Sequence, residues 1–224
     1  MGAVAEGRAG AIGSLDPMGH GTRERTWTEI ERRIVCGEMA AGARLDEDEL
    51  ATQLAVDTPV VREALCRLER DGFVRPEDGG AFAVAPLSEI EVREGYPVVI
   101  LLEGLAVRST PDFPPEAIVR LREINAEMAN ESSDPMAAAT HDYAFHEELA
   151  RHCANEQLLA TLRPLKRLML RYEYQYMAAA EFVSRSVHQH EEIIQALERG
   201  DRDTASALVE GNFRDSLPGI LEQL

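Results

Sequence analysis

Apolar positions in residues 26–85 first recur at helical spacing and then gather into two short runs. The helical spacing predicts three helices, over residues 26–37, 46–54 and 59–70. Asp46 opens the second helix with the kind of acceptor side chain that caps a helix N-terminus. The two apolar runs flank a Pro-Glu-Asp-Gly-Gly turn and predict a β-hairpin, with strands at residues 73–74 and 81–85. Helices followed by such a hairpin are the layout of a winged helix-turn-helix domain.

Beyond Ser88, apolar residues keep helical spacing almost to the end of the chain. Proline, asparagine and glycine divide this stretch into six predicted helices, over residues 88–109, 114–131, 135–152, 155–178, 180–198 and 201–222. The predicted fold is mainly α: an N-terminal winged helix-turn-helix followed by an antiparallel bundle of six to seven helices. We expect a flexible tail, a winged helix-turn-helix domain and an all-helical effector-binding and dimerisation domain, at residues 1–24, 25–86 and 87–224.

The composition indicates where in the cell the protein works. No apolar run among the 224 residues approaches the roughly 18–20 that a membrane helix needs, and the Gly/Ala-rich start lacks the features of a signal peptide. The three cysteines, Cys36, Cys66 and Cys153, are scattered and show no metal-ligand spacing. They are typical of buried free thiols in a reducing compartment. We therefore expect a cytoplasmic protein with no membrane partner.

Acidic residues outnumber basic ones throughout the chain. The formal net charge is −17, which argues against broad, nonspecific affinity for nucleic acid. Residues 25–86 alone carry eight arginines and thirteen acidic side chains, a net charge of −5. DNA-binding domains are usually basic or balanced. The candidate winged helix therefore combines a DNA-binding layout with an unfavourable charge.

Several short motifs occur in an order that is typical of one family. They are Gly42-x-Arg44-Leu45, Val61-Arg62-Glu63-Ala64-Leu65, Asp71-Gly72-Phe73-Val74, Leu102-Glu103-Gly104-Leu105-Ala106, Asp142-x-x-Phe145-His146 and His190-x-x-Ile193. Through these motifs, residues 25–222 resemble the GntR family of bacterial regulators, specifically its FCD (FadR C-terminal domain) branch. The resemblance implies a homodimeric transcriptional regulator that binds one operator half-site per subunit and responds to a small molecule bound in the bundle.

The segment that would contact DNA departs from the family pattern. The family's turn into the recognition helix usually reads Val-Ser-Arg-Thr-Pro-Val-Arg, whereas this chain reads Val56-Asp57-Thr58-Pro59-Val60-Val61-Arg62. The wing tip, Glu77-Asp78-Gly79-Gly80, also lacks the usual arginine. Losing two arginine contacts, each worth about 1–3 kcal/mol, predicts degraded DNA contacts. The remaining candidate contacts are Arg44, Thr58, Arg62 and Arg67. The alternative for Arg62 and Arg67 is a solvated helix face, paired with Glu63 or Asp71.

A candidate metal site is implied in the bundle. Asp142 and His146 are four residues apart, so one helix face presents both, and His190 starts the matching motif on a later helix. In the family these three resemble metal ligands, completed by a histidine whose position here is Asn212. Such a set suits a divalent metal, with zinc, nickel and manganese as candidates. The alternative is a buried polar network in which Asp142 and Asn212 hydrogen-bond the two histidines.

The effector pocket also departs from the family. Relatives that sense small carboxylates tend to place an arginine at the position of Val99, four residues before Glu103. Without that guanidinium a carboxylate loses its best bidentate donor, so we expect a more apolar pocket and a larger or less charged molecule. The residues predicted to line it are Val99, Glu103, Tyr143, Met169 and Tyr172. The alternative is that these side chains belong to the core.

Three functions are therefore open. The first is a ligand-responsive transcriptional regulator. The second is an enzyme of small-molecule metabolism descended from such a regulator, which has lost DNA binding and uses Asp142, His146 and His190 for metal-assisted or proton-transfer chemistry. The third is a binding or scaffolding protein without chemistry. The family resemblance favours the regulator.

Overall fold

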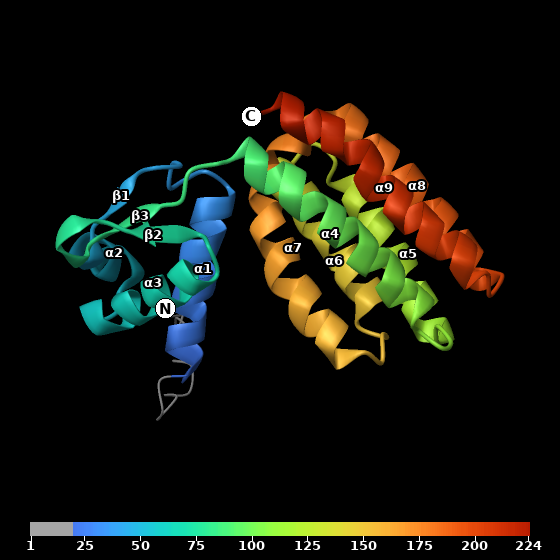
Figure 1. Cartoon of the computed structure of the whole chain (residues 1–224), viewed down its shortest axis with the longest axis horizontal. Coiled ribbons are helices and arrows are strands. Elements are labelled where there is room, and N and C mark those ends of the chain that lie inside the picture. Colours follow the sequence, from blue (N-terminus) through green and yellow to red (C-terminus); the bar gives the residue numbers. More distant parts are fainter. Residues whose placement is uncertain (1–19) are drawn as a thin grey trace, which may run out of the picture.

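A computed structural model describes residues 20–224 of the chain. These residues form two domains, a small winged helix-turn-helix and a larger bundle of helices (Figure 1). This arrangement confirms the predicted fold class. Nearly all of the predicted tail, residues 1–19, lies outside the described residues, and residues 20–24 belong to the first helix.

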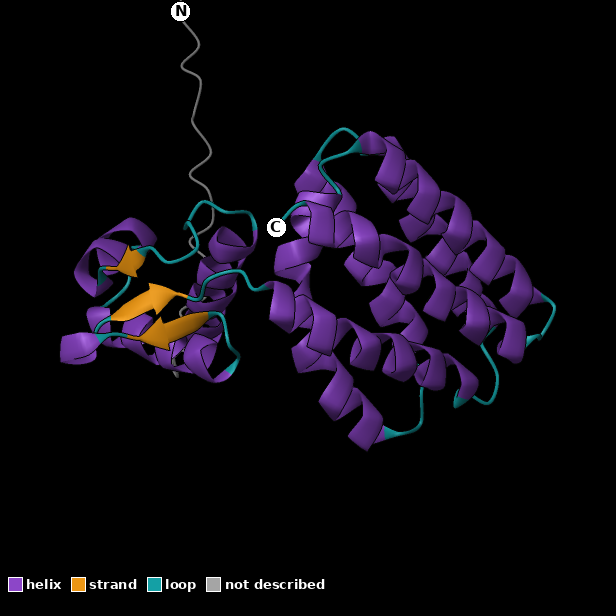
Figure 2. Ribbon diagram, turned by 45° about the horizontal axis from the view of Figure 1, so that its top comes forward, coloured by secondary structure: helices purple, strands orange, loops and turns teal. Residues whose placement is uncertain are grey.

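The N-terminal domain packs three helices against a small antiparallel sheet, with strand order β1-β3-β2 (Figure 2). Its elements are α1 (His20–Val35), β1 (Arg44–Leu45), α2 (Glu47–Leu54), α3 (Thr58–Arg70), β2 (Val74–Pro76), the short turn η1 (Asp78–Gly80) and β3 (Phe82–Val84). Side chains from all three helices fill the core together with Phe73 and Phe82. The predicted hairpin is present, and α3 occupies the position of a recognition helix.

Two features of this domain differ from the prediction. Helix α1 begins at His20 rather than near residue 26, because its first turns carry polar residues that give no apolar spacing. Strand β1 was not predicted, because two residues are too few to show alternation. The predicted cap is present: the Asp46 side chain accepts hydrogen bonds from the backbone of Asp48 and Glu49. Cys66 is exposed, contrary to the expectation of buried thiols, whereas Cys153 is buried.

The C-terminal domain is a bundle of six helices around a second core. They are α4 (Glu89–Arg108), α5 (Pro115–Asn130), α6 (Pro135–Ala150), α7 (Glu156–Tyr176), α8 (Ala180–Glu198) and α9 (Arg202–Glu222), and their ends lie within about two residues of the predictions. Helices α4 and α9 approach closely at Gly104, where a Cβ atom would lie 2.5 Å from an oxygen of Glu210. None of the helices described is long and apolar enough to cross a membrane.

Helix α7 lies between the two domains (Figure 1). Its inner face belongs to the bundle core, whereas Leu168, Leu170 and Tyr174 also pack against the core of the winged helix. Gly72, which follows α3 with a positive φ of 85°, leaves just enough room for Leu168. Arg171 donates a hydrogen bond to the carbonyl of Ala85. The winged helix-turn-helix domain therefore contacts the same helix that borders the interior of the bundle.

Candidate metal centre and DNA-binding face

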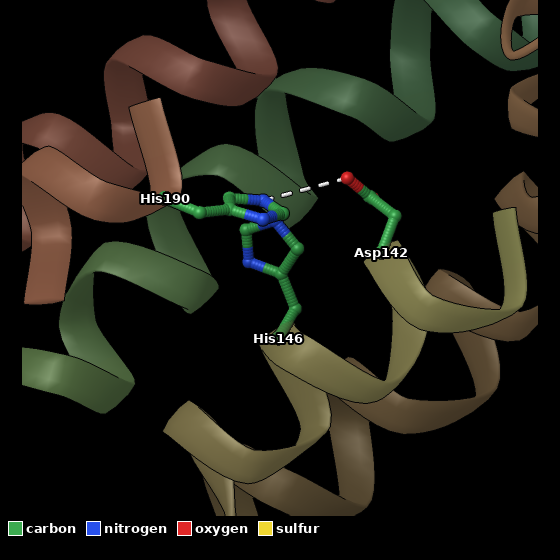
Figure 3. A group of neighbouring side chains, drawn as sticks. All are labelled: Asp142, His146 and His190. Carbon is green, nitrogen blue, oxygen red and sulfur yellow. Dashed lines mark ion pairs between the residues drawn. The ribbon is translucent and has the colours of Figure 1, made fainter. Parts of the chain in front are cut away.

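Three predicted metal ligands converge inside the bundle (Figure 3). Asp142 and His146 project from successive turns of α6, and His190 projects toward them from α8. All three side chains are buried, and one potential ligand atom from each lies within 4.8 Å of the others. The predicted fourth residue, Asn212 on α9, contacts His146. The structure therefore brings together the four residues that the sequence placed on three helices.

Aromatic side chains hold the two imidazoles in place. The Phe145 ring stacks on His190, with centroids 3.8 Å apart and planes inclined by 6°. The Phe213 ring lies 4.4 Å from that of His146. Because a stacked ring and a ring tilted by 43° pack against them, the imidazoles have few other orientations available.

Hydrogen bonding on the outer side of His190 fixes its tautomer. The Asn125 amide group donates to the carbonyl of Val187 at 3.0 Å, so its oxygen is left to accept from Nδ1 of His190 at 3.1 Å. Nε2 then carries a lone pair, and it lies 3.4 Å from Oδ1 of Asp142. Neither of these two atoms has a hydrogen-bond partner among the described residues. This outer-sphere support of a metal-ligating histidine is common in metalloproteins.

His146 lies between an amide and a buried ion pair. Its Nε2 hydrogen-bonds Oδ1 of Asn212 at 3.1 Å, and its unpartnered Nδ1 lies 3.8 Å from Oε2 of Glu103. The other oxygen of Glu103 lies 3.0 Å from Nζ of Lys166, a close ion pair without well-aligned hydrogen-bond geometry. Lys166 is the single lysine of the chain, and both members of this pair are buried.

Burial controls the charges in the cluster. Desolvation, followed by the nearby Lys166 ammonium, lowers the pKa of His190 to about 3 and that of His146 well below its usual value. Both imidazoles are therefore neutral near pH 7, which is the form that binds metal. Desolvation, with the neighbouring Glu173 as the next cause, raises the pKa of Asp142 well above its usual value. A divalent cation would compensate that buried carboxylate directly.

The donor set fits a divalent metal. Two neutral imidazoles and a carboxylate converge. In the described part of the chain, Asp142 Oδ1 and His190 Nε2 have no hydrogen-bond partner, as a metal would require. The adjoining cavity measures about 10 Å³, which is room for about one water molecule or ion. It is bordered by Asp142, Glu173, Tyr176, Met177, Ser186, Asn212, Phe213 and Ser216.

The five residues predicted to line an effector pocket do not border this cavity. Val99 and Met169 are core residues, and Glu103 forms the ion pair beside His146. Tyr143 covers Lys166, whose Nζ lies 4.8 Å from the ring centre. Tyr172 donates to Glu91 and accepts from the backbone of Ser88 at the start of α4.

Sequence reasoning missed several residues around the cluster. Glu173 borders the cavity and accepts a hydrogen bond from Tyr96 at 2.9 Å, while Asn125 and Gln189 support the two ligand groups from outside. None of them belongs to a spaced motif. Only Lys166 carried a signal, since one lysine on a mostly apolar helix face is unusual in a chain rich in arginine.

Three of the four candidate DNA contacts lie on one face. Arg44, Thr58 and Arg62 border a groove of about 590 Å³ between α2, α3 and the wing. Arg62 is half-exposed, and its guanidinium pairs with Glu47 at 3.0 Å and donates to the carbonyl of Gly80 at 3.4 Å. The Thr58 hydroxyl donates to Asp48 at 2.9 Å. Glu47 and Asp48 of α2 therefore bind the guanidinium and the hydroxyl that would otherwise be available to DNA.

Arg67 lies apart from this groove. Its guanidinium carbon lies 3.6 Å from the centre of the Trp27 ring, and its nearest carboxylate is Glu24 of α1 at 2.7 Å. In the alternative interpretation of Arg62 and Arg67 as a paired surface face, the partners are therefore Glu47 and Glu24 instead of Glu63 or Asp71.

A winged helix-turn-helix joined to an all-helical domain with a buried Asp/His/His group defines a class of bacterial transcription factor. Comparison with known families agrees: residues 22–84 match the bacterial regulatory proteins of the gntR family, and residues 94–214 match the FCD domain. The chain therefore belongs to the GntR family of transcriptional regulators, in the branch that carries an FCD domain.

Relatives match over most of the chain. The gluconate operon transcriptional repressor of Bacillus licheniformis is 29% identical, over 91% of this chain and 86% of its own length. The Nta operon transcriptional regulator of Aminobacter aminovorans is 30% identical, over 81% and 86% respectively. The solved structure of E. coli McbR/YncC has a TM-score of 0.75 at 19% identity, covering 90% of this chain and 97% of that one, and shows a similar fold.

Proposed function

We propose that the protein is a ligand-responsive regulator that binds operator DNA as a homodimer and carries a divalent metal at Asp142, His146, His190 and Asn212. One observation carries the metal proposal: two buried donor atoms from different helices, Asp142 Oδ1 and His190 Nε2, face each other without partners. The metal would supply a Lewis acid with coordination positions open for an effector. Zinc, nickel and manganese are the candidates.

DNA binding is proposed to use the groove bordered by Arg44, Thr58 and Arg62. Its contacts are expected to be weaker than in relatives, because Glu47 and Asp48 compete with phosphate for Arg62 and Thr58. Binding by this groove should therefore use few phosphate contacts and weaken with salt along a shallow slope.

The outward face of α4 is proposed to be the dimer interface. Val98, Leu101 and Leu105 are exposed at helical spacing, with Ile90 three turns before Leu101. An apolar stripe of this kind is typical of a surface that another protein covers. The family resemblance implies a second copy of this chain as that partner. Leu101→Glu should give monomers in sedimentation velocity, whereas Val119→Glu, at an exposed apolar position on α5, should leave dimers.

The effector is proposed to be less carboxylate-like than those of relatives with an arginine at position 99. Glu173, Ser186 and Ser216 border the cavity beside the cluster, so a ligand there would meet a carboxyl group and two hydroxyls. These groups favour a neutral, hydroxyl-bearing molecule that also coordinates the metal. A cavity of about 10 Å³ must open before it admits either an effector or a substrate, so its size does not separate the regulator from the enzyme. The enzyme hypothesis has less support because the chain belongs to a family of transcriptional regulators.

Fluorescence anisotropy tests the regulator directly. Purified protein is titrated onto labelled DNA from upstream of its own gene and onto scrambled DNA, at two salt concentrations, before and after treatment with a chelator. We expect specific binding that weakens with salt and changes when metal is removed. No preference for the upstream DNA at low salt, from protein shown to be folded, would contradict the proposal.

A further inference from the structure

We propose that Gln189 and Asp215 are positioning residues that make Asn212 an oxygen ligand of the metal. The inference rests on the metal centre proposed above and adds to it the class of metal that the centre prefers. Asn212 occupies the position at which the family resemblance implies a histidine. An amide can turn either its oxygen or its nitrogen toward the metal, so other residues of this protein must orient it.

A chain of three hydrogen bonds runs from the surface to the cluster. Gln189 on α8 donates from Nε2 to Oδ2 of Asp215 at 2.8 Å. Asn212 donates from Nδ2 to Oε1 of Gln189 at 2.9 Å. Oδ1 of Asn212 then lies 3.1 Å from Nε2 of His146. Asp215 is exposed and Asn212 is buried, so the chain crosses the wall of the bundle between α8 and α9.

The carboxylate of Asp215 fixes the donor-to-acceptor direction of every hydrogen bond in this series. An ionised carboxylate can only accept hydrogen bonds, so the amide nitrogen of Gln189 must face it. The Gln189 oxygen therefore faces Asn212 and requires the Asn212 nitrogen as its donor. The Asn212 oxygen is the atom left to face His146 and the cavity that Asp142 also borders. The orientation of both amides, often ambiguous, is here determined by an acceptor at the end of the chain.

The orientation of Asn212 decides whether the site can accept a cation. With its oxygen inward, Asn212 adds a neutral donor to the two imidazoles and the carboxylate of Asp142. With its nitrogen inward, two N–H bonds would point at the metal position and repel it. Within residues 20–224, the side-chain hydrogen bonds of Gln189 and Asp215 reach none of the proposed ligands except Asn212, so their effect passes through Asn212.

An amide oxygen in place of an imidazole changes the preferred class of metal. Imidazole favours zinc and nickel, whereas carboxylate and carbonyl oxygens suit harder ions such as manganese. A set of two nitrogens and two oxygens should therefore discriminate less between zinc and manganese than a set with three imidazoles. The absolute order of affinities still places zinc above manganese, so the ratio of the two is the informative quantity.

The test measures the dissociation constants of Mn²⁺ and Zn²⁺ by competition with a chromophoric chelator. The variants are Gln189→Leu, Asp215→Asn and Asn212→His. Gln195→Leu is the control, because Gln195 also lies on α8 but donates its hydrogen bond to Glu191, away from the cluster. Gln189→Leu should weaken both metals about 10-fold or more. Asp215→Asn should cause a smaller loss, because an asparagine there permits either amide direction. Asn212→His should raise the preference for zinc over manganese at least about 10-fold.

The outcomes separate the two proposals. If the wild-type protein binds neither metal, the metal centre is wrong, and the role of Gln189 and Asp215 falls with it. If the wild type binds metal and Gln189→Leu and Asp215→Asn bind it equally well, the metal centre stands and the positioning role is overturned. A general structural defect would lower thermal stability without changing the zinc-to-manganese ratio, so Asn212→His distinguishes ligation from packing. Should Gln189→Leu fail to fold, the exposed Asp215→Asn variant decides.

Discussion

The guanidinium of Arg167 lies 4.3 Å from the centre of the Trp27 ring, and so joins the helical bundle to the winged helix-turn-helix domain. The same side chain donates two hydrogen bonds to Glu31 of α1, at 3.0 and 2.8 Å, and reaches Asp71 at the end of α3 at 3.4 Å. Its neighbour Lys166 points the other way, to the Glu103 carboxylate beside His146. Two consecutive residues of α7 thus contact the winged helix-turn-helix domain and the surroundings of His146, respectively.

Replacing Arg167 by Met should loosen this connection. Glu31, with a side chain only 12% exposed, would lose its guanidinium partner, and burial already raises its pKa. We expect the free energy of unfolding to fall by about 1–3 kcal/mol. The emission of Trp27, the single tryptophan, should shift as well, because its ring loses a stacked cation. Urea denaturation followed by intrinsic fluorescence measures both.

A matched variant on the same helix gives the control. Arg163 is more exposed and pairs with Glu147 at 3.4 Å, within the bundle. Arg163→Met should change neither the emission of Trp27 nor the stability by more than about 0.5 kcal/mol. Equal effects of the two substitutions would contradict a specific link between the domains at Arg167.

The buried pair of Glu103 and Lys166 predicts a strongly non-additive response. Glu103→Gln leaves the Lys166 ammonium without its carboxylate in the bundle core and should destabilise the metal-free protein by about 3–5 kcal/mol. The double variant Glu103→Gln/Lys166→Met should recover most of that loss, because it buries no unpaired charge. Chemical denaturation measures each free energy of unfolding.

An exposed pair serves as the comparison. Arg120 and Glu123 lie 3.1 Å apart on α5 with half of each side chain exposed, so Glu123→Gln should change stability by less than about 1 kcal/mol. Additive effects of Glu103→Gln and Lys166→Met would show that the two groups do not depend on each other.

Glu47 offers a direct test of the DNA-binding face. Its carboxylate holds Arg62 at 3.0 Å in the groove that also contains Arg44. Glu47→Gln should free Arg62 for phosphate and strengthen operator binding about threefold to tenfold at low salt, with a steeper salt dependence. Glu116→Gln makes the same change in net charge at an exposed position of α5 and should leave the affinity unchanged. Unchanged binding by Glu47→Gln would place the DNA contact elsewhere.

The bundle helices could be predicted because each carries its own signal. For example, α7 starts after an asparagine cap and shows an apolar face, so its predicted range of 155–178 differs little from Glu156–Tyr176. The start of α1 carries no such signal: it is held by tertiary ion pairs, such as Arg23 with Glu63 and Glu24 with Arg67, which local spacing does not encode.

The residues of the candidate site also fall into those that the sequence could predict and those that it could not. Asp142, His146 and His190 could be found because they belong to motifs of the family. Asn125 and Gln189 could not, because Asn125 contacts His190 from α5 and Gln189 contacts Asn212 from α8. Only the packing of α5, α8 and α9 brings these pairs together. The pocket prediction rests on family positions for Val99 and Glu103 and on helical spacing for Tyr143, Met169 and Tyr172. Spacing alone cannot distinguish the side of a helix that borders the cavity from the side that packs in the core.

Glu173 predicts a pH dependence that is opposite in sign to that of the histidines. Burial, more than any other cause, raises its pKa from 4.5 to about 7. Because the folded state holds this proton more tightly, the stabilisation is complete below about pH 4.5 and is lost as the pH rises through 7. For His190, whose pKa is lowered to about 3, stabilisation is complete above about pH 6.5 and is lost as the pH falls.

Glu173→Gln isolates the carboxyl group, because glutamine can still accept the hydrogen bond from Tyr96 and does not titrate. The stability of the wild type relative to this variant should fall between pH 5 and 8, by on the order of 1–3 kcal/mol. The contribution of His190 is common to both proteins and cancels from the difference. Glu181→Gln, at an exposed position in the first turn of α8, should give a difference that does not vary with pH. A flat difference for Glu173→Gln as well, measured by denaturation at each pH, would mean that Glu173 is ionised throughout this range and that the cavity beside Asp142 is more hydrated than its burial indicates.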